Sequence, residues 1–155
     1  MIRINEGDLL CIEGEKQYYY VLILDKIKLF GGQLCFVYHK TTSEPVGAVE
    51  IVKTPNGFYE IIDFIWAKRE KRITKIKDNI DIKTIKEKIQ FFKNTFTLIG
   101  KAELWIIYDK NGNEVKKVNK LNDEEIKYPI YHRIDDRIMM KLVDEFYLPE
   151  NDERI

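Results

Sequence analysis

Few side chains in the sequence could act as a nucleophile, a base or a metal ligand. There are two histidines, His39 and His132, and two cysteines, Cys11 and Cys35. Neither histidine has a cysteine or carboxylate at the spacing of a zinc motif. Cys11, Cys35 and His39 could meet in the fold, as Cys-His catalysis requires, but the sequence has no nucleophile elbow, phosphate-binding loop or dinucleotide fingerprint. We therefore predict no catalytic residue, metal site or cofactor.

Both cysteines lie inside apparent strands. Free cysteine is among the most buried residue types, which favours two buried apolar thiols. A disulfide across neighbouring strands is the alternative.

The acidic side chains form adjacent groups. Neighbouring surface acids are poor glycosidase-type pairs, because such a pair must line a cleft with one pKa raised by burial. Their other use is electrostatic, as an acidic patch that binds and steers a basic partner. The candidate partner-binding residues are Asp123, Glu124, Glu125, Asp135, Asp136, Asp144 and Glu145.

A basic run is the alternative binding face. It lies beside Phe64 and Trp66, which could stack on nucleic-acid bases. Against this interpretation, the whole chain has 26 basic and 26 acidic side chains, whereas nucleic-acid modules are usually basic overall. The residues of this basic face are Lys68, Arg69, Lys71, Arg72, Lys75 and Lys77.

The charge is unevenly distributed along the chain. Residues 1–65 contain 6 basic and 9 acidic side chains, residues 66–101 contain 11 and 4, and residues 102–155 contain 9 and 13. The 155 residues predict one globular domain. We expect a cytoplasmic protein without a membrane segment, because neither a long apolar stretch nor a signal-peptide pattern is present.

These residues must be positioned by an α+β fold. Residues 1–62 predict a small, strongly bent antiparallel sheet or partial barrel, because short apolar runs alternate with glycine and proline turns. The expected strands are Asp8–Ile12, Tyr18–Leu24, Leu34–Tyr38, Ala48–Val52 and Phe58–Ile62.

Residues 63–93 predict a charged helical segment. The spacing of Ile82, Ile85 and Ile89 indicates a lysine-rich amphipathic helix over Thr84–Phe92. Residues 94–149 predict a second hairpin and a C-terminal helix. The apolar stretches of the hairpin are Phe96–Tyr108, interrupted by Gly100, and Val115–Val118.

A C-terminal amphipathic helix follows the second hairpin. We expect Asp135 to cap this helix and Pro149 to end it. Its predicted buried face consists of Ile134, Ile138, Met139, Leu142, Val143 and Phe146. The polar tail, residues 150–155, has too little apolar content to order itself.

Three segments carry a resemblance to a known family. The opening GDLLCIEGEKQYYYVLILD and the later FTLIGKAEL, followed by the helix RIDDRIMMKLVDEFY, resemble bacterial immunity proteins of the immunity protein 26 type, from polymorphic toxin systems. In that resemblance Gly7, Asp8, Leu9 and Leu10 begin a small barrel-like sheet, and Leu98, Ile99 and Gly100 end an apolar strand. A tryptophan that such patterns place before the late strand is replaced by Thr95, Phe96 and Thr97, and the lysine-rich middle has no counterpart.

The resemblance implies neutralisation of a cognate toxin by direct protein-protein binding, with no catalytic residue. A small nucleic-acid-binding module that uses residues 68–77 is the alternative, and an unassigned enzyme is the third hypothesis. The sequence does not indicate an oligomeric state.

Overall fold

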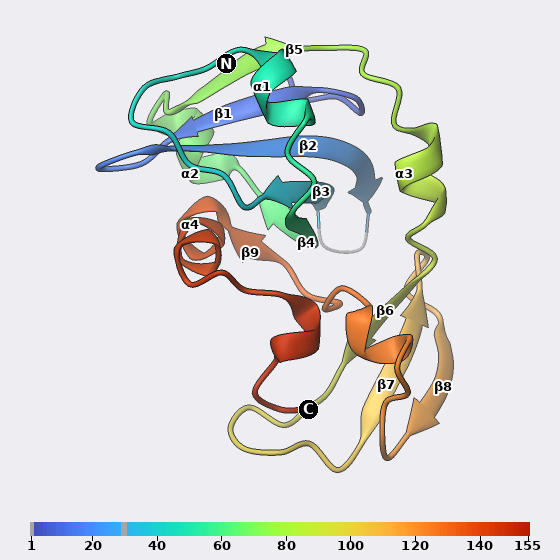
Figure 1. The fold of residues 1–155 in the computed structure, drawn as a ribbon. Helices are drawn as coiled ribbons and strands as arrows, with labels where there is room; N and C mark the ends of the chain where they lie inside the picture. The colour runs from blue at the N-terminus through green and yellow to red at the C-terminus, as the bar shows by residue number, and fades with distance from the viewer. Residues whose placement is uncertain (1, 29–30) are drawn as a thin grey trace.

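The computed structural model describes residues 2–28 and 31–155, which form an α+β fold with two β-sheets (Figure 1). The larger sheet is mixed, with the spatial order β5 (Ile73–Lys77), β1 (Leu9–Glu13), β2 (Tyr18–Ile27), β3 (Gly32–Tyr38), β4 (Gly57–Asp63) and β9 (Ile134–Asp135). The smaller sheet is antiparallel, with the order β6 (Phe91–Asn94), β7 (Trp105–Asp109) and β8 (Glu114–Val118). The helices of the described chain are α1 (Ala48–Val52), α2 (Ile65–Arg69), α3 (Lys83–Glu87), α4 (Asp136–Asp144) and the short 3-10 helices η1 (Glu125–Lys127) and η2 (Pro149–Asn151).

Strand β2 is buried on both faces, which explains its unbroken apolar sequence. Tyr19, Val21 and Ile23 face a core that includes Met139 and Val143 of α4. Alternate β2 residues face a second core, to which α1 and the segment after α3 contribute. In Figure 1 the chain runs from β5 through α3 to β6, so α3 connects the two sheets.

The Gly7-Asp8 pair begins the sheet. Gly7 has a φ of +83°, and its N–H donates to the Ile23 carbonyl at 2.8 Å. The Asp8 carboxylate is buried, accepts from the Asn5 N–H at 2.7 Å and pairs with Lys75 at 3.0 Å. The pair therefore has a structural role at the start of β1.

The structure confirms the α+β class and corrects the sheet. The predicted strand at Ala48–Val52 is helix α1 instead: Val49 and Val52 face solvent and only Ile51 is buried, so the run does not fill a strand position in the core. The partial barrel is not confirmed, because in the described chain the outer strands β5 and β9 pair only with β1 and β4.

The expected lysine-rich helix within residues 63–93 is not confirmed. That segment contains α2, β5 and α3 in turn. Helix α3 ends at Glu87, and Phe91 begins β6, in which Phe92 pairs with Tyr108. Sheet pairing thus overrides the helical spacing of the isoleucines.

The C-terminal half departs from expectation in three places. The predicted strand from Phe96 starts only at Trp105. Asp135 caps α4 as predicted, accepting from the Ile138 N–H at 2.9 Å, but Ile138 and Phe146 are exposed and Asp136 is buried. The polar tail is ordered: it contains η2, and the Asp152–Arg154 ion pair of 2.7 Å fixes its end.

No helix among the described residues has both the length and the apolar character needed to cross a membrane.

Candidate interaction surfaces

Four of the seven candidate acids bind groups within the protein, and two of them, Glu125 and Asp136, are buried. Glu125 is 3 % exposed and binds Lys116 Nζ at 2.6 Å, and Asp136 is fully buried with Arg72 Nη2 at 2.9 Å. Asp135 is the cap of α4, and Asp144 accepts hydrogen bonds from Tyr19 Oη and Gln17 Nε2, both at 2.8 Å. The bonds of Glu125, Asp136 and Asp144 connect separate elements of the fold, and burial leaves Glu125 and Asp136 poorly placed to bind a partner.

The electrostatics at Glu125 support this structural role. Burial alone would raise the pKa of Glu125, but hydrogen bonds from Lys116 and from the Asn122 N–H outweigh it and hold the pKa below its usual value. A buried carboxylate with both partners present is stabilised in its charged form.

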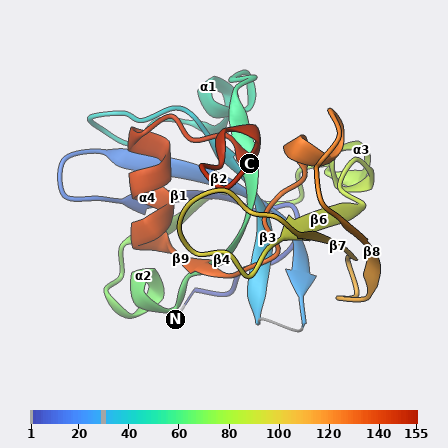
Figure 2. The ribbon, with the colours of Figure 1, turned by 90° about the horizontal axis from the view of Figure 1, so that it is seen from below.

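The other three acids, Asp123, Glu124 and Glu145, are exposed, as is Asp144. Asp123 and Glu124 precede η1, whereas Glu145 follows α4. Figures 1 and 2 place η1, in orange beside β6, apart from α4 at the other side of the molecule. The seven acids therefore do not form one patch.

The basic face is also partly internal. The Arg72 guanidinium donates to Glu70 Oε2 at 2.8 Å, to Asp136 Oδ2 at 2.9 Å and to the Glu13 carbonyl at 3.1 Å. Lys75 pairs with Asp8. Because Arg72 binds Asp136, the two sets that the sequence suggested as alternative faces are joined at this point.

Two arginines, one from the basic face and one from α4, flank an exposed aromatic ring. Trp66 is 46 % exposed, and the guanidinium groups of Arg69 and Arg137 each lie 5.5 Å from its ring centre. Lys71 and Lys77 are exposed, and Lys68 is half-buried. Trp66 and the two guanidinium groups place a flat aromatic surface and positive charge together at α2.

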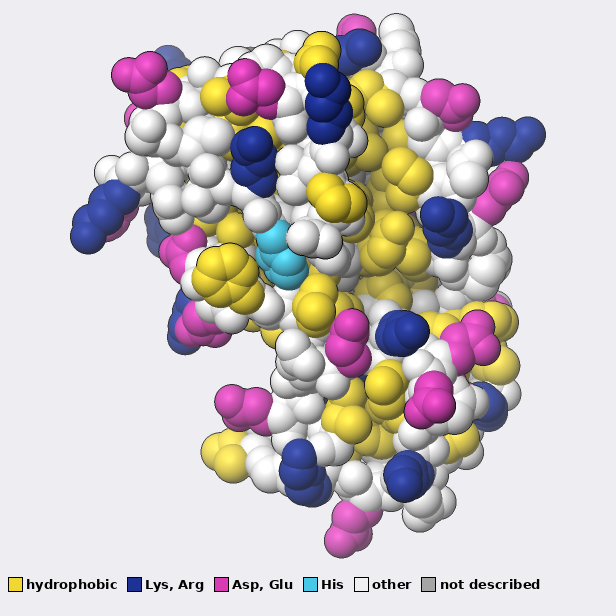
Figure 3. All heavy atoms as spheres, viewed as in Figure 1, with side chains coloured by type: hydrophobic (Ala, Val, Ile, Leu, Met, Phe, Trp, Pro, Cys, Tyr) yellow, Lys and Arg dark blue, Asp and Glu magenta, His cyan; other side chains and the backbone are white. Residues whose placement is uncertain are grey.

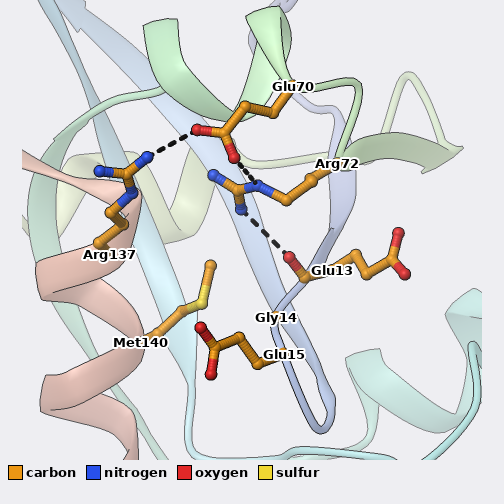
Figure 4. Close-up of a pocket in the computed structure, with 7 residues that line it drawn as sticks. All are labelled: Glu13, Gly14, Glu15, Glu70, Arg72, Arg137 and Met140. Carbon is orange, nitrogen blue, oxygen red and sulfur yellow. Dashed lines mark hydrogen bonds and ion pairs between the residues drawn. The ribbon is translucent and has the colours of Figure 1, made fainter.

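A pocket of about 550 Å³ lies between the β1–β2 turn, the end of α2 and α4. Figure 4 shows the Glu70 carboxylate between Arg137, at 2.7 Å, and Arg72. Hydrogen bonds from Arg72 and Arg137 lower the pKa of Glu70. These groups are paired with one another. The pocket is therefore lined by an ion network that connects α2, β5 and α4. The other lining residues are Glu13, Gly14, Glu15 and Met140.

The cysteines and histidines do not form a nucleophilic pair. Cys11 and Cys35 are both buried free thiols and face opposite cores, which excludes the disulfide. Burial raises the pKa of both thiols, so they stay protonated at neutral pH. His39 lies against the ring of Phe58, at 5.2 Å, and in the described chain it has no hydrogen bond to either thiol. The described residues contain no cluster of three or more potential metal ligands of the His, Cys, Asp and Glu types.

One buried carboxylate was missed from the sequence. Glu60 is 1 % exposed, and its carboxylate lies 2.9 Å from His132 Nε2. Burial raises the pKa of Glu60, and the interaction with His132 opposes that rise. The signal was present in the run Phe58–Ile62, where Glu60 shares the inward face with its two apolar ends. The carboxylate is inside the protein, away from any solvent-borne substrate.

A second missed feature is an exposed apolar loop, residues 95–104, between β6 and β7. Phe96 is 83 % exposed, Leu98 88 % and Ile99 93 %. Figures 1 and 2 show the loop projecting from the lower end of the molecule, next to the C-terminal segment. The sequence predicts an apolar strand here, so the apolar character of these residues is visible in the sequence but their exposure is not.

The base of this loop is held in place. Thr95 Oγ1 donates to the Leu104 carbonyl at 2.7 Å and accepts from the Thr97 N–H at 3.3 Å. Arg154 donates to the Thr97 carbonyl at 3.3 Å, and its own carbonyl accepts from the Ala102 N–H at 2.8 Å. The ordered tail therefore supports the loop that carries the exposed side chains.

A further apolar band is visible in the space-filling view. Figure 3 shows hydrophobic side chains gathered between α1 and α3, over β2 to β4. Partly buried members of the second core, among them Phe36 and Tyr59, belong to this face of the sheet.

Comparison of the chain with protein-family models, with curated proteins and with solved structures found no match in any of the three.

Proposed function

We propose that this chain is an immunity-type inhibitor, which neutralises a cognate bacterial toxin by direct contact and performs no chemistry of its own. The observation that supports binding most strongly is the loop of residues 95–104. Three large apolar side chains within four residues, each more than four-fifths exposed, are unusual on a monomer surface and are typical of protein-protein contacts.

The supported base of the loop favours binding. A contact loop that is already ordered loses little conformational entropy when its partner arrives. Thr95 and Arg154 supply that order through the hydrogen bonds described above. In this proposal Phe96, Leu98 and Ile99 insert into an apolar pocket of the toxin.

The exposed acids have a secondary role in the proposal. Asp123, Glu124 and Glu145 steer a basic toxin surface toward the chain and affect mainly the association rate. The other four candidates contribute only indirectly, by stabilising the fold: Glu125, Asp135, Asp136 and Asp144.

The proposal predicts that the gene directly upstream of this one encodes a secreted toxin, and the test uses the product of that gene. The triple variant Phe96→Ser, Leu98→Ser, Ile99→Ser should lose protection of cells that express this toxin, and should weaken binding of the purified toxin by about 100-fold or more. The matched control is Val49→Ser with Val52→Ser, which removes two exposed apolar side chains from α1. Full protection by the triple variant, or an equal loss in the control, would contradict the proposal.

One observation favours nucleic-acid binding as the second candidate. Trp66, half exposed between two guanidinium groups, offers a stacking surface with positive charge beside it. The test is retention of the protein on single-stranded oligonucleotides. Retention that decreases steeply with salt, with quenching of tryptophan fluorescence, would support nucleic-acid binding over toxin inhibition.

A further inference from the structure

β5 is the first strand of the larger sheet. Among the strands that the structure describes it pairs with β1 alone, so its outer edge has no strand partner there. The Glu13 N–H donates to the Arg72 carbonyl at 2.7 Å, and Cys11 lies opposite Thr74. In an antiparallel ladder the bonded pairs alternate, so the main-chain groups of Ile73 and Lys75 point away from β1. No turn, loop or cap hydrogen bond of the described chain involves these groups.

Positive charge at both ends of β5 limits which strands can pair with this edge. Lys71 lies just before β5 and Lys77 at its end, and both are exposed. Two copies of such an edge repel each other, because lysines on an edge strand discourage pairing with a like strand. The same lysines attract an acidic strand.

A small pocket flanks the edge. It has a volume of about 260 Å³ and lies between the outer strands and the loop that contains Pro45 and Val46. Its apolar wall includes Cys11, Tyr18 and Ile76. Added strands are recognised through main-chain bonds plus pockets for alternate side chains, and this edge offers both.

We propose that β5 binds an extended acidic segment of a partner protein as an added strand. The segment takes main-chain hydrogen bonds from Ile73 and Lys75, places carboxylates near Lys71 and Lys77, and inserts one apolar side chain into the pocket. This binding mode does not involve the apolar loop of residues 95–104. An experiment can therefore refute one of the two proposals and leave the other standing.

The probe is a blocked eight-residue peptide of alternating glutamate and valine, and its control replaces each glutamate by lysine. We expect the acidic peptide to bind the full chain, with affinity that falls as salt is raised, and to slow hydrogen exchange of the Ile73 and Lys75 amides. Lys71→Glu with Lys77→Glu should weaken binding by about tenfold. The charge-matched control, Lys117→Glu with Lys120→Glu, changes two exposed lysines outside β5 and should have little effect.

Three results would overturn strand addition. The first is binding that leaves the exchange of Ile73 and Lys75 unchanged, which indicates charge attraction alone. The second is equal binding of the lysine peptide, or no binding of either peptide. The third is displacement of the acidic peptide by a single-stranded oligonucleotide of higher affinity, which would assign this face to nucleic acid instead.

Discussion

Charged side chains inside this protein are each paired with a named group. Asp136 is paired with Arg72, Glu60 with His132, and Lys93 with two main-chain carbonyls. An ion pair at the surface contributes little to stability, whereas loss of one member of a buried pair leaves a charge without compensation. Burial therefore decides which of these residues the fold depends on.

Arg72→Met is predicted to destabilise the protein by about 3 kcal/mol, because the carboxylate of Asp136 stays buried without its partner. Urea unfolding followed by circular dichroism measures the change. Arg137→Met is the control: Arg137 is 60 % exposed and binds Glu70 at 2.7 Å, so its loss should cost less than about 1 kcal/mol. Equal losses in the two variants would show that burial of Asp136 is not the cause.

At the level of elements, the sequence predicted the strands better than the helices. Tyr18–Leu24 and Phe58–Ile62 lie within β2 and β4, since runs of apolar and aromatic residues suit a buried sheet. The prediction of a strand at Ala48–Val52 was wrong. A segment of five residues is too short for its periodicity to distinguish a strand from a helix. The predicted helix over Thr84–Phe92 does not continue beyond Glu87, because Phe91 and Phe92 pair with β7 as part of β6.

The candidate site was less predictable than the fold, because exposure and pairing are long-range properties. Asp136 and Arg72 are 64 residues apart in sequence, so nothing local indicates that they bind each other. Leu98 and Ile99 were expected inside a strand, and their exposure depends on the loop geometry fixed by Arg154. Periodicity reports which residues are apolar, but tertiary contacts decide which remain at the surface.

Gly7→Ala is predicted to destabilise the protein by about 2 kcal/mol. Gly7 has a φ of +83°, and a Cβ atom there would lie 2.8 Å from the Ile80 carbonyl oxygen. The substitution therefore strains the start of β1 and its contact with the segment between β5 and α3. Gly47→Ala is the control, because Gly47 has a φ of −75° and open space around it, and should leave the melting temperature unchanged or slightly raised. A similar melting temperature for the two variants would refute this.

Across the whole molecule, residues 129–135 connect the two sheets. Lys93 of β6 donates its N–H to the Pro129 carbonyl at 2.9 Å, and its own carbonyl accepts from the Tyr131 N–H at 2.8 Å. Three residues after Tyr131, β9 begins and pairs with β4 in the larger sheet. The Lys93 side chain extends this connection, since Nζ donates to the carbonyls of Ile126 and Pro149 and so joins η1 and η2 to β6.

This buried amine should make stability depend on pH. Burial lowers the pKa of Lys93 to about 8 from its usual 10.5. Between these values the unfolded chain binds a proton that the folded chain has lost, so the contribution of Lys93 to stability rises with pH. Buried tyrosines and thiols act in the opposite direction at high pH, because burial raises their pKa values, that of Tyr38 to about 12.

Comparison with Lys93→Met separates these effects, because the tyrosines and thiols are common to both proteins. The stability of the wild-type chain relative to the variant should increase by about 2 kcal/mol between pH 7.5 and pH 10, measured by urea unfolding at each pH. Lys117→Met, which changes an exposed lysine of β8, should show no such trend. A constant difference between wild type and Lys93→Met would mean that Lys93 titrates as an ordinary surface amine, and that the join between the two sheets does not depend on its charge.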